Sequence, residues 1–285
     1  LGRFGELGSE GVLALLPDST NIEMPGSTPS ERTVGESFNK LFQMAGDRRI
    51  IIATFASNIH RIQQIIDYAV KYDKKVSVSG RSMVNVVATA IELGYLKVPS
   101  GILVDIDVAN RLPFNEVVLI TTGSQGEPLS ALSRMAMSEH RKVKVTPNDF
   151  IIISARPIPG NEKFVNRVVN ELMRLGAEVI YEKMYEVHVS GHACQDEQKL
   201  MMALTKPQYI LPVHGEYKHL RKYSIVAKQM GIDEDHVIIP AIGQVLETDG
   251  ESFRFGGEVP SGAVMVDGLG VGDVGSIVLR DRKHL

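Results

Sequence analysis

Two histidine-containing turns are the strongest chemical feature of the sequence. Residues 188–192 have the sequence His-Val-Ser-Gly-His, and residues 212–216 have the sequence Pro-Val-His-Gly-Glu. Imidazole nitrogens are common metal ligands and also exchange protons near neutral pH. One such histidine alone is more often a surface or capping residue. Because histidine stands beside glycine at the end of an extended segment twice in one chain, the pattern favours a functional site.

A carboxylate and two hydroxyls follow each other in Asp18, Ser19 and Thr20. They come after the short apolar run 11–16, which predicts a buried strand that opens into a loop at Pro17. The same triplet is a common cap of helices and turns. Taken by itself it favours the cap.

Two loops that contain glycine could bind phosphate. Residues 79–82 are Ser-Gly-Arg-Ser and residues 122–126 are Thr-Gly-Ser-Gln-Gly, and each precedes an expected helix. Backbone N–H groups at the start of a helix attract anions, and Arg81 adds a charge that can bind phosphate bidentately. Neither loop matches a Walker sequence or a full dinucleotide fingerprint, so each signal is weak.

The elements that must position these residues alternate along the first two thirds of the chain. This alternation predicts an α/β fold with a doubly wound, mostly parallel sheet covered on both faces. In such sheets ligands bind outside the carboxyl ends of the strands, which directs attention to the loops that hold Ser57 and Arg81. The expected strands are 50–55, 75–79, 117–122, 150–154 and 178–181, and the expected helices are 60–72, 83–93, 129–137 and 164–175.

The pattern changes after Glu186. We expect helices at 195–204 and 220–230, and a strand at 209–213 that ends at His214. From Val237 onward short strands with glycine turns are expected, and the chain closes with the basic stretch 280–283.

Composition bounds the protein class. The 285 residues suffice for one large domain or two ordinary ones, and 44% hydrophobic with 23% charged residues is typical of a globular protein. A single cysteine, Cys194, excludes an internal disulfide and fits a reducing cytoplasm. No apolar run is long enough to cross a bilayer, and the first ten residues do not have the pattern of a signal peptide. The net charge of −3 leaves room for a local basic groove that binds phosphates.

Together these motifs resemble a known family. Asp18-Ser19-Thr20, the His192 of Ser-Gly-His and the His214 of Pro-Val-His-Gly-Glu are similar to motifs A, B and C of the β-CASP branch of metallo-β-lactamase-fold nucleases. The resemblance extends over essentially the whole chain. The stretches that resemble bacterial ribonuclease J specifically are 53–61, 122–128, 157–161 and 260–282.

The resemblance implies a domain organisation in which a β-CASP domain is inserted into a metallo-β-lactamase αββα fold, with RNA entering between them. Residues 1–36 would end the first metallo-β-lactamase part, and 37–188 would form the β-CASP domain. Residues 189–285 would form the returning metallo-β-lactamase part and the start of a linker. A further C-terminal domain would follow.

The family's metal centre would be incomplete in this chain. Its two zinc ions are held mainly by a His-x-His-x-Asp-His motif that this sequence does not contain, and only the motif C histidine, His214, is present. One imidazole cannot hold zinc tightly, because zinc sites need three or four ligands. We therefore expect zinc, or manganese or magnesium in its place, to be absent or weakly bound here, and the chain alone to be inactive.

The resemblance also implies roles for individual residues. Asp18 would position a metal-ligating group, and His192 would stabilise the scissile phosphate as charge develops on it, while metal-activated water attacks phosphorus. The residues expected to bind a 5′ monophosphate are Ser57, Arg81, Ser190, Gly191 and His192.

The whole enzyme would be a cytoplasmic 5′-to-3′ exoribonuclease and endoribonuclease of RNA processing and decay. It would act on single-stranded, 5′-monophosphorylated RNA as a homodimer or tetramer, without a membrane. Two alternatives stay open: a module that binds RNA or nucleotide phosphate without cleaving it, and an unrelated doubly wound small-molecule enzyme.

Overall fold

The computed structural model describes residues 1–264, 266–267 and 270–271. Contacts divide the chain into two compact units, one of Leu1–Thr28 with Gly191–Leu285 and one of Pro29–Ser190. We call them the histidine unit and the sheet unit. The domain boundaries at residues 36 and 188 stay predictions, and the basic stretch 280–283 lies outside the described residues.

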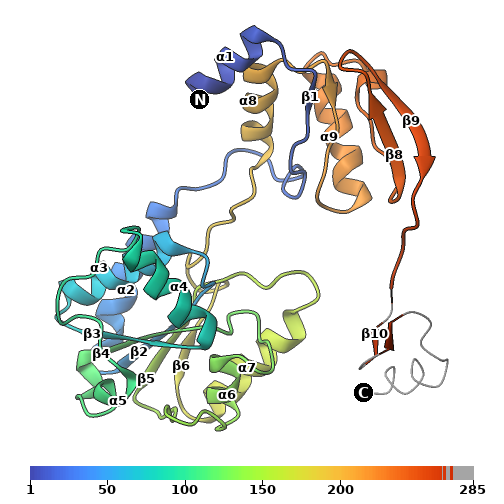
Figure 1. The fold of residues 1–285 in the computed structure, drawn as a ribbon. Coiled ribbons are helices and arrows are strands. Elements are labelled where there is room, and N and C mark those ends of the chain that lie inside the picture. The colour runs from blue at the N-terminus through green and yellow to red at the C-terminus, as the bar shows by residue number, and fades with distance from the viewer. Residues whose placement is uncertain (265, 268–269, 272–285) are drawn as a thin grey trace. The chain divides into compact units, whose positions relative to one another are not determined.

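The sheet unit contains a five-stranded sheet in which every pair of neighbouring strands is parallel (Figure 1). The strand order is β3-β4-β2-β5-β6, so the chain runs from the central strand β2 to the edge strand β3, returns to β4 between them, and then continues on the other side of β2 through β5 to β6. This arrangement confirms the expected doubly wound sheet. The strands are β2 (Arg49–Ala53), β3 (Lys75–Ser79), β4 (Val117–Thr121), β5 (Asp149–Ile153) and β6 (Glu178–Ile180).

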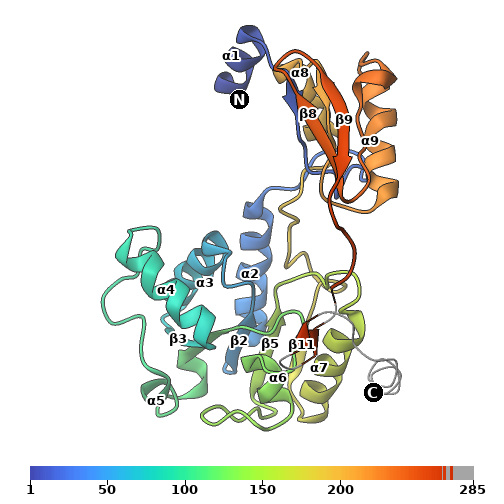
Figure 2. The same ribbon diagram turned by 45° about the vertical axis from the view of Figure 1, so that its right-hand side comes forward.

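Both faces of this sheet are apolar, which is why its strands appear as continuous hydrophobic runs in the sequence. In β2, Ile50 and Ile52 belong to one core cluster and Ile51 and Ala53 to the other, as the two-residue period of a strand requires. All four side chains are fully buried. Helices α2, α3 and α4 pack on the first face and α6 and α7 on the second (Figure 2).

Side-chain caps mark where several of these helices begin. Ser30 accepts a hydrogen bond from the backbone N–H of Arg32, and Asn58 accepts one from that of Arg61. The helices of the sheet unit are α2 (Glu31–Ala45), α3 (Ile59–Lys71), α4 (Arg81–Glu92), α5 (Ile106–Ala109), α6 (Ala131–Ala136) and α7 (Glu162–Arg174), with the 3₁₀ helix η1 (Phe114–Glu116) before β4.

The guanidinium of Arg61 is fully buried and joins four segments of the sheet unit. It donates to the Glu31 carboxylate at 2.5 and 2.9 Å and to the carbonyls of Ser154 and Val187 at 3.0 and 3.1 Å. A buried charge is tolerated only when it is paired and hydrogen-bonded, and Arg61 meets both conditions. It thereby fixes the chain just before His188.

A second buried ion pair lies at the amino ends of two neighbouring strands. Arg49 on β2 and Asp149 on β5 are register partners, and their side chains form two parallel hydrogen bonds of 2.6 and 3.0 Å. Arg49 also donates to the Lys144 carbonyl at 2.8 Å, and its guanidinium lies 4.8 Å from the centre of the Phe114 ring. The pair thus ties the start of the sheet to the segment that precedes β5.

The histidine unit is built from shorter elements. A parallel pair of strands, β1 and β7, packs with α8 and α9 around buried Ile22, Ile210 and Tyr223. The described elements are α1 (Gly2–Glu10), β1 (Ala14–Leu15), α8 (Gln195–Thr205), β7 (Tyr209–Ile210), α9 (Tyr217–Gln229), η2 (Glu234–His236), β8 (Gln244–Thr248), β9 (Phe253–Glu258), β10 (Val266–Asp267) and β11 (Gly270–Val271).

Several features of this unit differ from the sequence-based expectation. The buried strand expected at 11–16 is limited to Ala14–Leu15 and is half-buried, and the strand expected at 209–213 is limited to Tyr209–Ile210. The chain begins with a helix, α1, and a Cβ added to its Gly8 would lie 2.1 Å from the Leu204 carbonyl oxygen of α8. Helix α9 begins at Tyr217 rather than Leu220, because Glu216 and His219 form a reciprocal cap around its first turn. Among the described helices, none has both the length and the apolar character needed to span a bilayer.

We expect replacement of Asp149 by Asn to destabilise the sheet unit by about 3–5 kcal/mol, because it leaves the buried Arg49 charge unpaired. Urea unfolding followed by circular dichroism measures this change. The control is Asp107→Asn, which removes the partner of Lys142 in a solvent-exposed ion pair and should have little measurable effect. Equal effects of the two substitutions would contradict the prediction.

Candidate functional site

Parallel pairing of two distant segments brings Asp18 beside His214. Strands β1 and β7 pair at Leu15 and Ile210, and the pairing continues in the same register to Asp18 and Val213. The backbone N–H of Val213 donates to the Pro17 carbonyl at 2.9 Å, and that of Ser19 donates back to the Val213 carbonyl at 3.0 Å. The two loops therefore leave this ladder at the same end, one residue past the isolated bridge between Asp18 and Val213.

His192 reaches the same place from the segment that precedes α8. Its Nδ1 atom forms a hydrogen bond with Oδ2 of Asp18. Its backbone carbonyl accepts hydrogen bonds from the Asn21 side-chain amide at 2.9 Å and from the Thr28 hydroxyl at 3.1 Å. These bonds hold the backbone of His192 against the loop that follows Asp18.

The third side chain, His214, lies against both. Its Nδ1 atom is 2.7 Å from the Thr20 hydroxyl and 3.5 Å from Oδ1 of Asp18. The His192 and His214 rings are stacked, with centroids 5.4 Å apart and an angle of 20° between their planes. Asp18 also accepts the backbone N–H of Thr20 at 2.8 Å, so the capping role expected of the triplet is real, and it coexists with the histidine contacts.

The backbone of His214 has an unusual conformation. Its φ of 57° is in the left-handed region, and Gly215 follows with a φ of 117°. A side chain in this region costs roughly 1–3 kcal/mol, which surrounding contacts must offset. The hydroxyl of fully buried Ser19 supplies such contacts, because it lies 3.0 Å from the Val213 carbonyl oxygen and 2.5 Å from that of His214.

Hydrogen bonds determine the charge state of Asp18. Partial burial raises the pKa of its carboxyl, but the hydrogen bonds from His192 and Thr20 outweigh burial and lower the pKa from 3.8 to about 2. Asp18 is therefore a carboxylate at neutral pH. It presents a fixed negative charge to the two imidazoles.

Asp18, His192 and His214 are the one group of three potential metal ligands found among the described residues, with donor atoms within 4.8 Å of one another. Three protein ligands are the minimum for a catalytic zinc ion. Both Nδ1 atoms, however, take part in hydrogen bonds, His192 with Asp18 and His214 with Thr20. The set does not fit a two-zinc centre, which needs more donors than these residues provide.

His188 belongs to the sheet unit, and its imidazole is in a different environment from those of His192 and His214. Its Nδ1 atom is buried without a hydrogen-bond partner among the described residues. Burial, followed by the charges of Arg61 and Arg156, lowers the pKa of His188 to about 4. The imidazole is therefore neutral at physiological pH.

The residues expected to bind phosphate are divided between the two units. Ser57 is exposed in the loop after β2, and Arg81 is exposed at the first position of α4, after β3; the two strands end at the same edge of the sheet. Strand β4 lies between those two strands, so the loops start about 10 Å apart. Ser190 ends the sheet unit and Gly191 begins the returning part of the histidine unit. A common pocket of these residues stays a prediction.

Sequence reasoning did not identify the residues that hold the site. Ser19 belongs to the triplet that the sequence pointed to, but its role depends on a carbonyl 195 positions away. Asn21 and Thr28 bind the carbonyl of His192 across 171 and 164 positions. The only feature of the sequence that could have indicated these supporting residues is the run of polar residues after Asp18.

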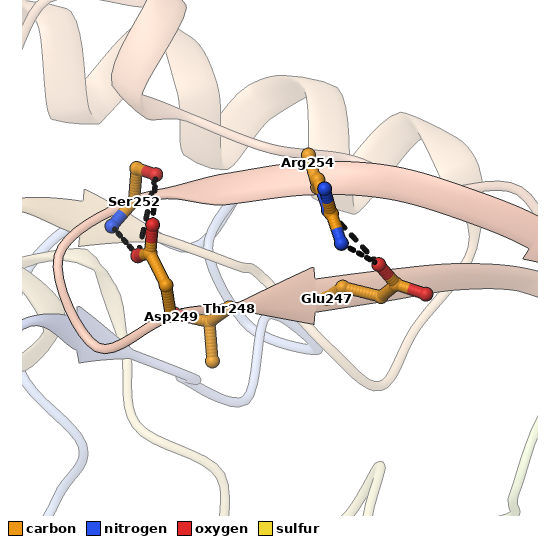
Figure 3. Close-up of a pocket in the computed structure, with 5 residues that line it drawn as sticks. All are labelled: Glu247, Thr248, Asp249, Ser252 and Arg254. Carbon is orange, nitrogen blue, oxygen red and sulfur yellow. Dashed lines mark hydrogen bonds and ion pairs between the residues drawn. The ribbon is translucent and has the colours of Figure 1, made fainter.

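A separate pocket of about 510 Å³ lies on the β8–β9 hairpin (Figure 3). Its charged groups already pair with one another, since Arg254 binds Glu247 at 2.8 Å and Asp249 accepts the backbone N–H of Ser252 at 2.8 Å. It therefore offers no free donor set comparable to the histidine cluster.

Comparison with known proteins gives consistent matches over the whole chain. Residues 47–172 match the family described as "Ribonuclease J, beta-CASP domain", and residues 176–240 match the "Zn-dependent metallo-hydrolase RNA specificity domain". Ribonuclease J 1 of Streptococcus pyogenes and ribonuclease J of Thermus thermophilus are each 45% identical to the chain over 100% of its length. The match covers 51% of the first relative and 49% of the second. Ribonuclease J2 of Bacillus subtilis is 43% identical, with 100% and 51% covered. The chain spans about half the length of these relatives.

The low pKa of Asp18 predicts a pH dependence. A carboxyl whose pKa is lower in the folded chain stabilises the fold above its unfolded value of 3.8, and that contribution disappears as the pH falls to about 2. In His192→Ala we expect the pKa to rise toward 3.8 and this part of the acid sensitivity to shrink. Carboxyl titration by NMR measures the pKa of Asp18, and urea unfolding at several pH values measures the acid sensitivity. His60→Ala, at an exposed position of α3, is the control, and an unchanged Asp18 titration in His192→Ala would refute the prediction.

The incomplete donor set predicts weak metal binding. After dialysis with zinc we expect the chain to retain less than one tightly held ion, because three partly engaged ligands bind zinc poorly. His214→Ala should abolish what remains, and His60→Ala should not. Elemental analysis of the dialysed protein decides the matter, and two retained zinc ions per wild-type chain would show the prediction to be wrong.

Proposed function

Because the chain belongs to the ribonuclease J family, we propose that it is the RNA-handling part of a metal-dependent ribonuclease that hydrolyses phosphodiesters. The observation that carries the proposal is the assembly of Asp18, His192 and His214 from three distant segments into one cluster. Structural stability does not require a charged carboxylate between two imidazoles at the surface, whereas phosphodiester hydrolysis uses such groups.

Each residue has a role in this proposal. Asp18 orients His192 through the Nδ1 hydrogen bond and would stabilise a positive charge on its imidazole as negative charge develops on the scissile phosphate. Asp18 and Thr20 also contact Nδ1 of His214 and so fix the ring that would supply one zinc ligand. Since this donor set does not fit two zinc ions, the remaining ligands would come from the half of the relatives that the chain does not match.

We propose single-stranded RNA with a 5′ monophosphate as the substrate of the whole protein, in RNA processing and decay. Arg81 supports this choice, because it stands at the start of 12-residue helix α4, whose N-cap is Gly80 without a side-chain cap. Within the described residues Arg81 has no ion-pair partner. Free backbone N–H groups and a free guanidinium at one helix start suit a phosphate. Ser57, Ser190, Gly191 and His192 would supply further donors.

The second candidate is a module that binds RNA or nucleotide phosphate without cleaving it. The incomplete metal donor set favours it for this chain alone. Incubation of labelled RNA with zinc or manganese separates the two candidates. Cleavage by a longer protein that contains this chain, and not by the chain itself, supports the first; cleavage by neither supports the second. Cytoplasmic location and a dimer or tetramer in the whole protein stay part of the proposal.

Binding of RNA ends tests the phosphate residues. We expect the chain to prefer 5′-phosphorylated over 5′-hydroxyl oligonucleotides, and Arg81→Ala to reduce that preference roughly ten- to hundredfold, as loss of a charge-assisted bond of about 1.5–3 kcal/mol implies. Fluorescence anisotropy at fixed ionic strength measures the affinities. Arg167→Ala, at an exposed position of α7, changes the charge equally and should leave the preference intact. Equal affinity of the wild type for both ends would overturn the assignment.

A further inference from the structure

A buried glutamine connects two of the three segments that form the site. Gln198 lies one turn into α8 and is only 4% exposed. Its side-chain Nε2 donates to the Asp18 carbonyl at 2.7 Å and to the Ala193 carbonyl at 3.4 Å. Ala193 directly follows His192, so one amide group holds the backbones of both members of the Asp18–His192 pair.

The orientation of this amide is determined by its partners. Tyr223 donates its hydroxyl hydrogen to Oε1 of Gln198 at 3.1 Å. A flipped amide would place its oxygen against two carbonyl oxygens and its NH₂ group against a donor. Both N–H groups and the oxygen of Gln198 are therefore used, which satisfies the requirement that buried polar groups be hydrogen-bonded.

Tyr223 gives the amide a fixed support. Its side chain is fully buried in the core cluster that includes Ile22, Met202 and Val226. Burial raises the pKa of the Tyr223 hydroxyl, so this group stays protonated and remains a donor. Tyr223 and Gln198 therefore connect the core of the histidine unit to the Asp18 loop through two successive hydrogen bonds.

We propose that Gln198 is a positioning residue that sets the register between the Asp18 loop and the His192 segment, and thereby maintains their side-chain hydrogen bond. The carbonyl of His192 accepts hydrogen bonds from Asn21 and Thr28, which follow Asp18 in the same loop. Without Gln198, the carbonyls of Asp18 and Ala193 lose their common donor. The loop is then joined to the His192 segment only farther from Asp18, by Asn21 and Thr28 and by the backbone bonds of Gln195 and Asp196 to the carbonyls of Met24 and Gly26, so the register at Asp18 itself loosens. A role of this register in catalysis rests on the proposed function. The effect of Gln198 on the register does not.

The test reads the Asp18–His192 hydrogen bond directly, by the proton NMR signal of the His192 imidazole N–H in the 285-residue chain. A strong hydrogen bond to a carboxylate moves this signal far downfield and slows its exchange with water. We expect the signal in the wild type and its loss, or at least about tenfold faster exchange, in Gln198→Leu. His192→Gln identifies the signal by its disappearance.

Three further variants separate positioning from general stability. Gln198→Asn keeps the amide but shortens its reach, so it should lose the signal as Gln198→Leu does, and it substitutes for that variant if the latter does not fold. Tyr223→Phe removes the support but leaves both carbonyl bonds, so the signal should persist with faster exchange. Met202→Ala, one turn along α8 in the same core, should lower the Tm and leave the signal unchanged.

A wild-type chain without the downfield signal, or a signal that survives with unchanged exchange in folded Gln198→Leu and Gln198→Asn, would overturn the proposal. Loss of the signal in Met202→Ala to the same extent would also overturn it, because Gln198 would then act only through stability. None of these measurements depends on RNA cleavage. If the NMR results hold and neither the chain nor a longer protein that contains it cleaves or binds RNA, the proposed function fails and the positioning role stands.

Discussion

Parallel pairing between the segments around Leu15 and Ile210 is the constraint on which the candidate site depends. Only two residue pairs form the regular part of this ladder, yet alternating hydrogen bonds carry it on to Asp18 and Val213. In a parallel pair both chains leave at the same end. The loop that holds a carboxylate and the loop that holds His214 therefore open together, although 196 positions separate them in the sequence. A one-residue slip would turn these side chains to the opposite face.

The site beyond this ladder depends on hydrogen bonds from buried and half-buried polar side chains. Ser19 offsets the strained backbone of His214, Asn21 and Thr28 bind the carbonyl of His192, and Gln198 binds that of Asp18. Each of these bonds fixes a backbone rather than a reacting side chain. The imidazoles and the carboxylate can therefore stay partly exposed, with 40% of the His192 side chain and 39% of the Asp18 side chain accessible, and still keep a defined geometry. Groups that act on a polymer such as RNA need this combination of access and order.

The sheet unit is held together differently, by apolar packing and ion pairs. Its apolar strands are joined by the buried Arg49–Asp149 pair, and its helices by the partly buried Arg61–Glu31 pair. The segments that follow β2 and β3 lie at the carboxyl edge of the sheet. The phosphate-binding residues that we propose there need no strain of the kind seen at His214. Ser57 lies four residues after β2 and Arg81 two residues after β3, and the fold places the ends of both strands on one edge of the sheet.

The sequence by itself determined the doubly wound sheet, because runs such as Ile50-Ile51-Ile52 and the helical periodicity between them are local properties of the chain. It also pointed to Asp18, His192 and His214 through their motifs, and so to the family. It did not predict α1 or the first turn of α9, since these depend on the close contact of Gly8 with α8 and on a reciprocal cap. Only the tertiary structure could show that Gln198, an unremarkable helical glutamine in the sequence, binds Asp18. The contacts of a buried amide are chosen by the backbones that folding brings to it, here from 180 positions away, and no local pattern encodes that choice.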